Sequence, residues 1–67
     1  MDKEKAKECI EQGRLAQAVA NNRKDAWEWA ESAVLAIHGR LDFFAIPWIG
    51  IPAFPDWDRL ESRLNLK

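Results

Sequence analysis

Cys9 and His38 are the only cysteine and the only histidine in the chain, and these residue types are well suited to nucleophilic catalysis near neutral pH. A thiol nucleophile needs a base and an orienting group within hydrogen-bonding reach. If residues 21 and 22 form a turn between antiparallel helices, residue 9 lies opposite residue 34, and His38 is about one helical turn away. We therefore interpret Cys9 as a small core residue and predict no catalytic residues.

Metal and cofactor binding are disfavoured by the same scarcity of ligands. His38 and Asp42 are four residues apart, so both could touch one ion from a helix, but two ligands are too few for a stable site. The chain has no glycine-rich loop that could hold phosphates. We expect no metal and no cofactor, and the chain is predicted not to be an enzyme.

The charge balance argues against two further classes of partner. Ten Lys and Arg residues against eleven Asp and Glu give a formal charge of −1, which offers no basic surface to nucleic acid or to anionic membranes. The basic pairs Arg23–Lys24 and Arg59/Arg63 lie among acids. The charged residues 1–5 lack the apolar region of a secretory signal, and no apolar run is long enough to span a membrane. We expect a cytoplasmic protein that binds neither membranes nor nucleic acid.

Aromatic residues are the strongest indication of binding. The chain has four Trp and three Phe among 67 residues, a large apolar load. Trp27 and Trp29 are two positions apart, so a helix directs them about 160° apart. Trp27 falls on the core side, whereas Trp29 lies at the rim, where it either covers a subunit interface or contacts a partner. Trp48 and Phe54 likewise either cover the core or contact a partner.

These spacings yield two sets of candidate residues. The residues predicted to bind a partner are Trp29, Leu35, Arg23, Trp48 and Phe54. The residues predicted to form the core or a dimer contact are Trp27, Ala30, Val34, Ile37 and Leu41.

The first element that must position these side chains is a helix over residues 2–20. Good helix formers dominate this stretch, and Asp2 can cap its start. Small residues form a stripe along one face, which lets another helix or a bulky side chain approach closely. Gly13 lies on that stripe, and we interpret it as a close contact or a local kink.

A second helix is predicted over residues 23–41. Asn21–Asn22 interrupts the first helix, and Asn22 can cap the second. Gly39 can end this helix, or residues 40–44 can continue it. A break of two residues between helices predicts an antiparallel helical hairpin.

The last third of the chain is predicted to be an apolar arm followed by a short helix. Residues 43–55 contain three prolines, a glycine and many large apolar residues, so we expect an extended, polyproline-like arm. This arm folds back on the hairpin, crosses to a second subunit or docks on a partner. Residues 56–66 are predicted to be helical, with Asp56 or Asp58 as the cap. The fold class is therefore all-α in a single domain.

Self-association is expected because the chain is small. A domain of this size buries too little surface to be strongly stable alone. One cysteine cannot form a disulfide within the chain, and no metal site is expected. We therefore predict a homodimer or a higher oligomer.

The segment 25–37 carries a family resemblance. Its sequence, Asp-Ala-Trp-Glu-Trp-Ala-Glu-Ser-Ala-Val-Leu-Ala-Ile, resembles a stretch of the small phage-encoded quorum-sensing anti-activators, which are of nearly the same length. The resemblance implies a helical dimer that inhibits host proteins, such as a quorum-sensing transcription regulator or a pilus-assembly ATPase. The family's partner-binding tryptophan matches Trp29. Its upstream tyrosine has no counterpart, because Arg23 and Lys24 occupy that region, and the arm has no match.

Three functions follow from the sequence. The leading hypothesis is a non-catalytic phage or mobile-element protein that binds and inhibits a bacterial host protein, such as a transcription regulator or a defence factor. The first alternative is an oligomer that sequesters a signal nucleotide, with Arg23, Lys24 and Arg40 on phosphates and tryptophans stacked on bases. The second alternative is a small DNA-binding repressor, which the near-neutral charge disfavours.

Overall fold

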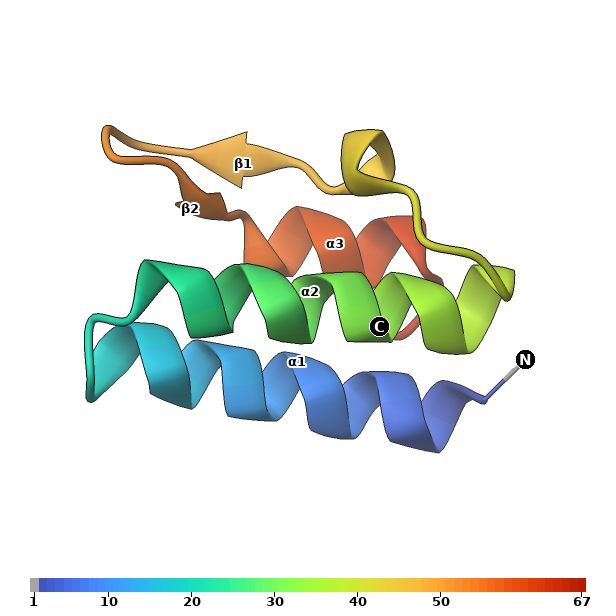
Figure 1. Cartoon of the computed structure of the whole chain (residues 1–67). Helices are drawn as coiled ribbons and strands as arrows, with labels where there is room; N and C mark the ends of the chain where they lie inside the picture. Colours follow the sequence, from blue (N-terminus) through green and yellow to red (C-terminus); the bar gives the residue numbers. More distant parts are fainter. Residues whose placement is uncertain (1) are drawn as a thin grey trace.

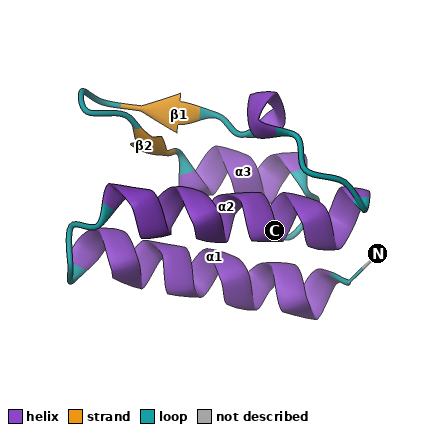
Figure 2. Ribbon diagram, in the orientation of Figure 1, coloured by secondary structure: helices purple, strands orange, loops and turns teal. Residues whose placement is uncertain are grey.

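Two long helices come first in the chain, and a small sheet and a third helix complete the fold (Figure 2). This computed structural model describes residues 2–67. The elements, in chain order, are α1 (Lys3–Ala18), α2 (Arg23–His38), the 3₁₀ turn η1 (Phe43–Ala45), β1 (Trp48–Ile49), β2 (Phe54–Pro55) and α3 (Trp57–Arg63).

Side-chain caps set the starts of α1 and α2, as predicted. The carboxylate of Asp2 accepts a hydrogen bond from the backbone N–H of Lys5, at 2.9 Å. The amide oxygen of Asn22 accepts one from the N–H of Asp25, at 3.1 Å. Asn21 takes the left-handed conformation, with φ 48°, which asparagine tolerates better than most residues. These local preferences place the turn of the hairpin at residues 19–22.

The predicted antiparallel hairpin of α1 and α2 is confirmed (Figure 1). The backbone N–H of Asp2 donates to the carbonyl of Ala36 at 2.9 Å, so the start of α1 is tied to the end of α2. Alanines let the two helices pack closely, because they add little bulk between the backbones. The fully buried alanines are Ala6, Ala26, Ala30 and Ala33.

Gly39 ends α2, so the predicted helix over 23–41 is three residues too long. Gly39 has φ 76°, and its N–H donates to the carbonyl of Leu35 at 2.9 Å. A left-handed residue after the last turn stops a helix, and glycine takes this conformation without steric cost. Residues 40–44 therefore leave the helix, and η1 begins with its own cap, Asp42.

The prediction of an extended arm over 43–55 is wrong in its local structure. Residues 43–45 form η1, and β1 pairs antiparallel with β2 in the register Trp48–Pro55 and Ile49–Phe54. Prolines disfavour a strand in the middle of a sheet, but a ladder of two pairs has no middle strand. The tetrapeptide 50–53 closes this β-hairpin, with Gly50 at φ 92° and a cis bond between Ile51 and Pro52.

In the single chain the arm folds back on its own helices, which is the first of the three arrangements considered from the sequence. The carbonyl oxygen of Ala53 accepts two hydrogen bonds from α2, from Trp27 Nε1 at 3.0 Å and from Arg23 Nε at 2.7 Å. Arg63 of α3 donates to the carbonyl of Ala45 at 3.2 Å. Ile46 of the arm is buried in the core, with 3% of its surface exposed. The arm is thus held at both ends by side chains that reach its backbone.

Helix α3 closes the core against α1. Asp56 caps it by accepting from the N–H of Arg59, so Asp56 rather than Asp58 is the cap. The helix covers Trp57–Arg63, shorter than the predicted 56–66. Trp57 and Leu60 point inward, with exposed fractions of 7% and 0%. The other large core residues are Ile10, Trp27, Val34, Ile46, Leu64 and Leu66.

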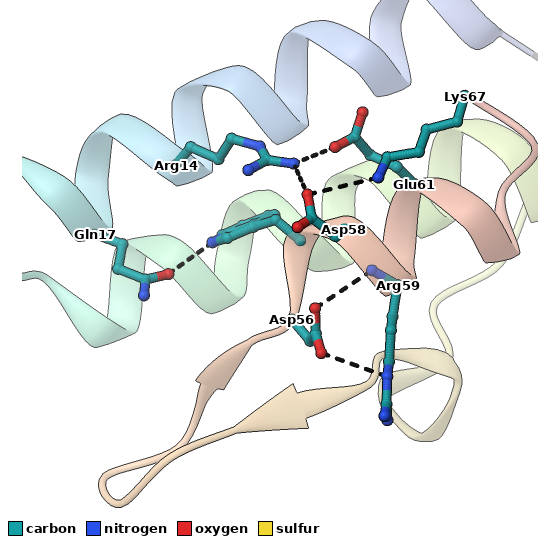
Figure 3. Close-up of polar contacts among 8 residues, drawn as sticks. Arg14, Gln17, Asp56, Asp58, Arg59, Glu61 and Lys67 are labelled. Atoms are coloured by element: carbon teal, nitrogen blue, oxygen red, sulfur yellow. Dashed lines mark hydrogen bonds and ion pairs between the residues drawn. The ribbon is translucent and has the colours of Figure 1, made fainter.

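An ion-pair cluster also ties α3 to α1 (Figure 3). Arg14 Nη2 donates to Asp58 Oδ1 at 2.9 Å and also contacts the carboxylate of Glu61. Lys67 lies 3.7 Å from the same oxygen of Asp58. The hydrogen bond from Arg14, followed by the charge of Lys67, lowers the pKa of Asp58 below its ordinary value of 3.8.

This lowered pKa predicts an acid-dependent loss of stability. A carboxyl group whose pKa is lower in the folded chain stabilises it above the ordinary pKa, and this contribution disappears as the pH falls through the folded pKa. We expect Arg14→Gln to narrow the difference in urea midpoint between neutral pH and about pH 2.5. Urea unfolding of both proteins at the two pH values measures it. An equal acid-induced drop in the two proteins would contradict the prediction.

Candidate functional site

The residues predicted for the core or a dimer contact are mostly enclosed within a single chain. Trp27, Ala30 and Val34 of α2 are buried in the core, with exposed fractions of 7%, 0% and 0%. Ile37 is partly buried and packs against the same cluster. Leu41 lies beyond the end of α2 and is 65% exposed. The broad apolar face of α2 is therefore covered by α1, the arm and α3.

Some of the residues predicted to bind a partner are exposed, and others already contact the rest of the chain. Trp29 and Leu35 on α2 are 37% and 45% exposed, and Trp48 on β1 is 60% exposed. Phe54 is partly buried and packs against the core. Arg23 is exposed but holds the carbonyl of Ala53 through its Nε. The structure does not bring these five residues into one site.

A groove of about 440 Å³ lies where η1 meets α2. Trp27 and Phe43 contribute its aromatic surface, with their ring centroids 4.7 Å apart and their planes tilted by 33°. Phe43 comes from the arm, so sequence reasoning on the helix alone missed it. The charged walls are formed by Arg23, Lys24, Glu28 and Glu31.

A second hollow of about 290 Å³ adjoins the first along α2. It is lined by Asp25, Glu28, Trp29 and Ser32, and Glu28 is common to both hollows. Positions 25, 28, 29 and 32 share one side of a helix because they are three or four residues apart. We call the two hollows together the α2 face, formed by Arg23, Lys24, Asp25, Trp27, Glu28, Trp29, Glu31, Ser32 and Phe43.

The α2 face combines exposed aromatic surface with more acidic than basic groups. Asp25, Glu28 and Glu31 form no ion pair with another residue in the range 2–67 that the structure describes. Of the two basic residues, Arg23 donates its Nε to the carbonyl of Ala53. The face therefore offers three available carboxylates beside Trp29 and the Trp27–Phe43 pair.

The groups singled out for chemistry lie elsewhere. Cys9 is buried, with 4% of its surface exposed. Burial raises the pKa of its thiol, although Lys5 acts in the opposite direction, so little thiolate is present at neutral pH. His38 ends α2 and is exposed. Within residues 2–67, no group of three potential metal ligands gathers, and no helix is long and apolar enough to cross a membrane.

Comparison with models of protein families, with curated proteins and with solved structures finds no match for this chain.

Proposed function

We propose that this chain is a non-catalytic protein that binds a bacterial host protein through the α2 face and inhibits it by covering a functional surface. The observation that carries the proposal is Trp29, a large aromatic side chain that lines a hollow and remains 37% exposed. Tryptophan is enriched among the residues that dominate binding energies at protein interfaces. Such inhibition requires only affinity and a sufficient number of copies.

The charges of the α2 face specify the chemistry of the partner. Asp25, Glu28 and Glu31 favour a partner segment that carries Lys or Arg, because opposite charges steer association and select the register. The aromatic surface of Trp27, Trp29 and Phe43 favours apolar side chains between those basic residues. We therefore expect an amphipathic, basic segment on the host protein.

The same charges weigh against the nucleotide-sequestering alternative. Phosphates would lie beside Arg23 and Lys24, but Glu28 and Glu31 line the same groove and would repel them. A phage or mobile-element origin and a quorum-sensing regulator as the target remain proposals, supported by the resemblance of residues 25–37 to the anti-activators.

Affinity capture with the full chain tests the proposed function. The tagged wild type should recover one bacterial protein at comparable molar amounts, and Trp29→Ala should weaken its binding by about 30-fold or more. Binding of the purified pair by titration calorimetry measures the change. The captured protein should also lose its activity when the wild-type chain is added in equal amount.

Val19→Ala is the matched control. Val19 is 81% exposed and lies directly after α1, the other helix of the hairpin. The substitution therefore removes exposed apolar surface away from the α2 face. It should leave the affinity unchanged. If Trp29→Ala and Val19→Ala bind the captured protein equally, the α2 face is not the contact surface.

A further inference from the structure

Strand β1 leaves one of its edges open. Strand β2 packs on α2, and among residues 2–67 β1 pairs only with β2, so β1 is the outer strand of the sheet (Figure 1). The N–H of Asp56 donates to the carbonyl of Pro47 at 2.9 Å, immediately before the Trp48–Pro55 pair in the ladder. Because bonded and non-bonded pairs alternate in an antiparallel ladder, Trp48–Pro55 is a non-bonded pair. The backbone N–H and C=O of Trp48 therefore point away from β2.

Large apolar side chains surround this open edge. Trp48 and Ile49 are 60% and 62% exposed, and Phe44 and Ile51 are 94% and 100% exposed. No residue between 43 and 55 carries a charge. We call Phe44, Trp48, Ile49 and Ile51, together with the open backbone of Trp48, the arm edge.

The exposed area of the arm edge suits a protein interface. A fully exposed large apolar residue has an accessible surface of about 200 Å². The exposed fractions of the four residues therefore add up to roughly 600 Å² of accessible surface. This total is spread along the arm, from η1 to the tip of the β-hairpin. It also supplies most of the roughly 800 Å² that each partner buries in a standard interface.

We propose that the arm edge binds a second copy of this chain, with the two β1 strands antiparallel across a two-fold axis at Trp48. In this register the two Trp48 residues exchange N–H to C=O hydrogen bonds, because each directs both groups outward. The axis also runs the two arms in opposite directions, so the hairpin tip of one copy, which carries Ile51, lies towards the η1 end of the other copy, which carries Phe44. The same surface is used by both copies, so each arm edge is complementary to itself.

Charge and position support a second copy as the occupant. The uncharged segment 43–55 brings no like charges together when it meets itself. The arm edge shares no residue with the α2 face. The inference therefore goes beyond the proposed function, and either can fail without the other.

Sedimentation equilibrium of the full chain tests the inference. From about 1 to 500 μM, the wild-type mass should rise from that of one chain towards that of two, because dimerisation follows mass action. Ile49→Lys should raise the dimer dissociation constant by about 100-fold, since it places a charge at the interface. Trp48→Pro should raise it by at least tenfold, because it removes the outward N–H and the exposed indole at the axis without removing a bond to β2.

Val19→Lys is the control, because it adds the same charge at an exposed position directly after α1. It should dimerise like the wild type, and all variants should keep the wild-type melting temperature at low concentration. A wild type that stays monomeric throughout, or a dimer that Ile49→Lys and Trp48→Pro leave intact, would overturn the inference. A monomer that sediments with phosphatidylglycerol vesicles, and no longer does so as Ile51→Lys, would assign the arm edge to lipid and overturn it as well.

Discussion

Replacing Trp57 with alanine is expected to lower the free energy of unfolding by about 3–5 kcal/mol. Trp57 is 7% exposed and is the first residue of α3. Its ring covers Gly13 of α1. Its Nε1 donates to the amide oxygen of Gln17 at 2.6 Å, and Figure 3 shows this bond ending at the labelled Gln17. Alanine would leave a cavity between α1 and α3 and an amide without its partner. Urea unfolding followed by far-ultraviolet circular dichroism measures the loss.

Trp48→Ala is the matched control for this substitution. It removes the same type of side chain from a position that is 60% exposed, so it should cost less than about 1 kcal/mol at a concentration where the chain is monomeric. A similar cost for the two substitutions would contradict the assignment of Trp57 as the residue that holds α3 on α1.

Gly13→Ala is expected to destabilise the chain by about 1–3 kcal/mol. The direction of this change in stability is unusual, because alanine in place of glycine stabilises an ordinary helix interior by about 1 kcal/mol. Here an added Cβ would lie inside the indole of Trp57, 2.7 Å from Cζ2 and 2.8 Å from Cζ3. Those atoms belong to a rigid ring on the first residue of α3, so the ring or the start of the helix would have to shift.

A double-mutant cycle tests this explanation. In the background of Trp57→Ala the obstructing ring is absent, so Gly13→Ala should raise stability through helix propensity. The measurement is again the urea midpoint of the four proteins. A stabilising effect of Gly13→Ala in the wild-type background would show that α3 yields easily and would refute the close contact.

The local parts of the fold were predictable because their causes lie within a few residues. Asp2, Asn22 and Gly39 form hydrogen bonds with backbone groups three or four positions away. Such capping residues can be identified from the sequence. Gly13 was interpreted as a close contact or a local kink; the structure shows a close contact, and the neighbour that makes it is 44 positions away. Nothing in the sequence near Gly13 specifies that neighbour.

The arm and the candidate site were less predictable because they depend on contacts between distant segments. The prolines and the glycine of residues 43–55 indicated an extended arm. The structure instead has a short β1–β2 ladder, and α2 supports it through two hydrogen bonds to the carbonyl of Ala53. Trp29 was placed at the rim from its helical position alone. The neighbouring groove was missed because Phe43 completes it from the arm.

The two hydrogen bonds to Ala53 have a consequence for how the arm can diversify. Their acceptor is a main-chain oxygen, so the bonds from Trp27 and Arg23 do not require any particular side chain at residue 53. The neighbouring tip residues 49–52 are exposed and take no part in either bond. Residues 49–52 can therefore be substituted while the two hydrogen bonds to the carbonyl of Ala53 are kept. The helices serve as a fixed frame on which natural selection, or a randomised library, can present new recognition loops.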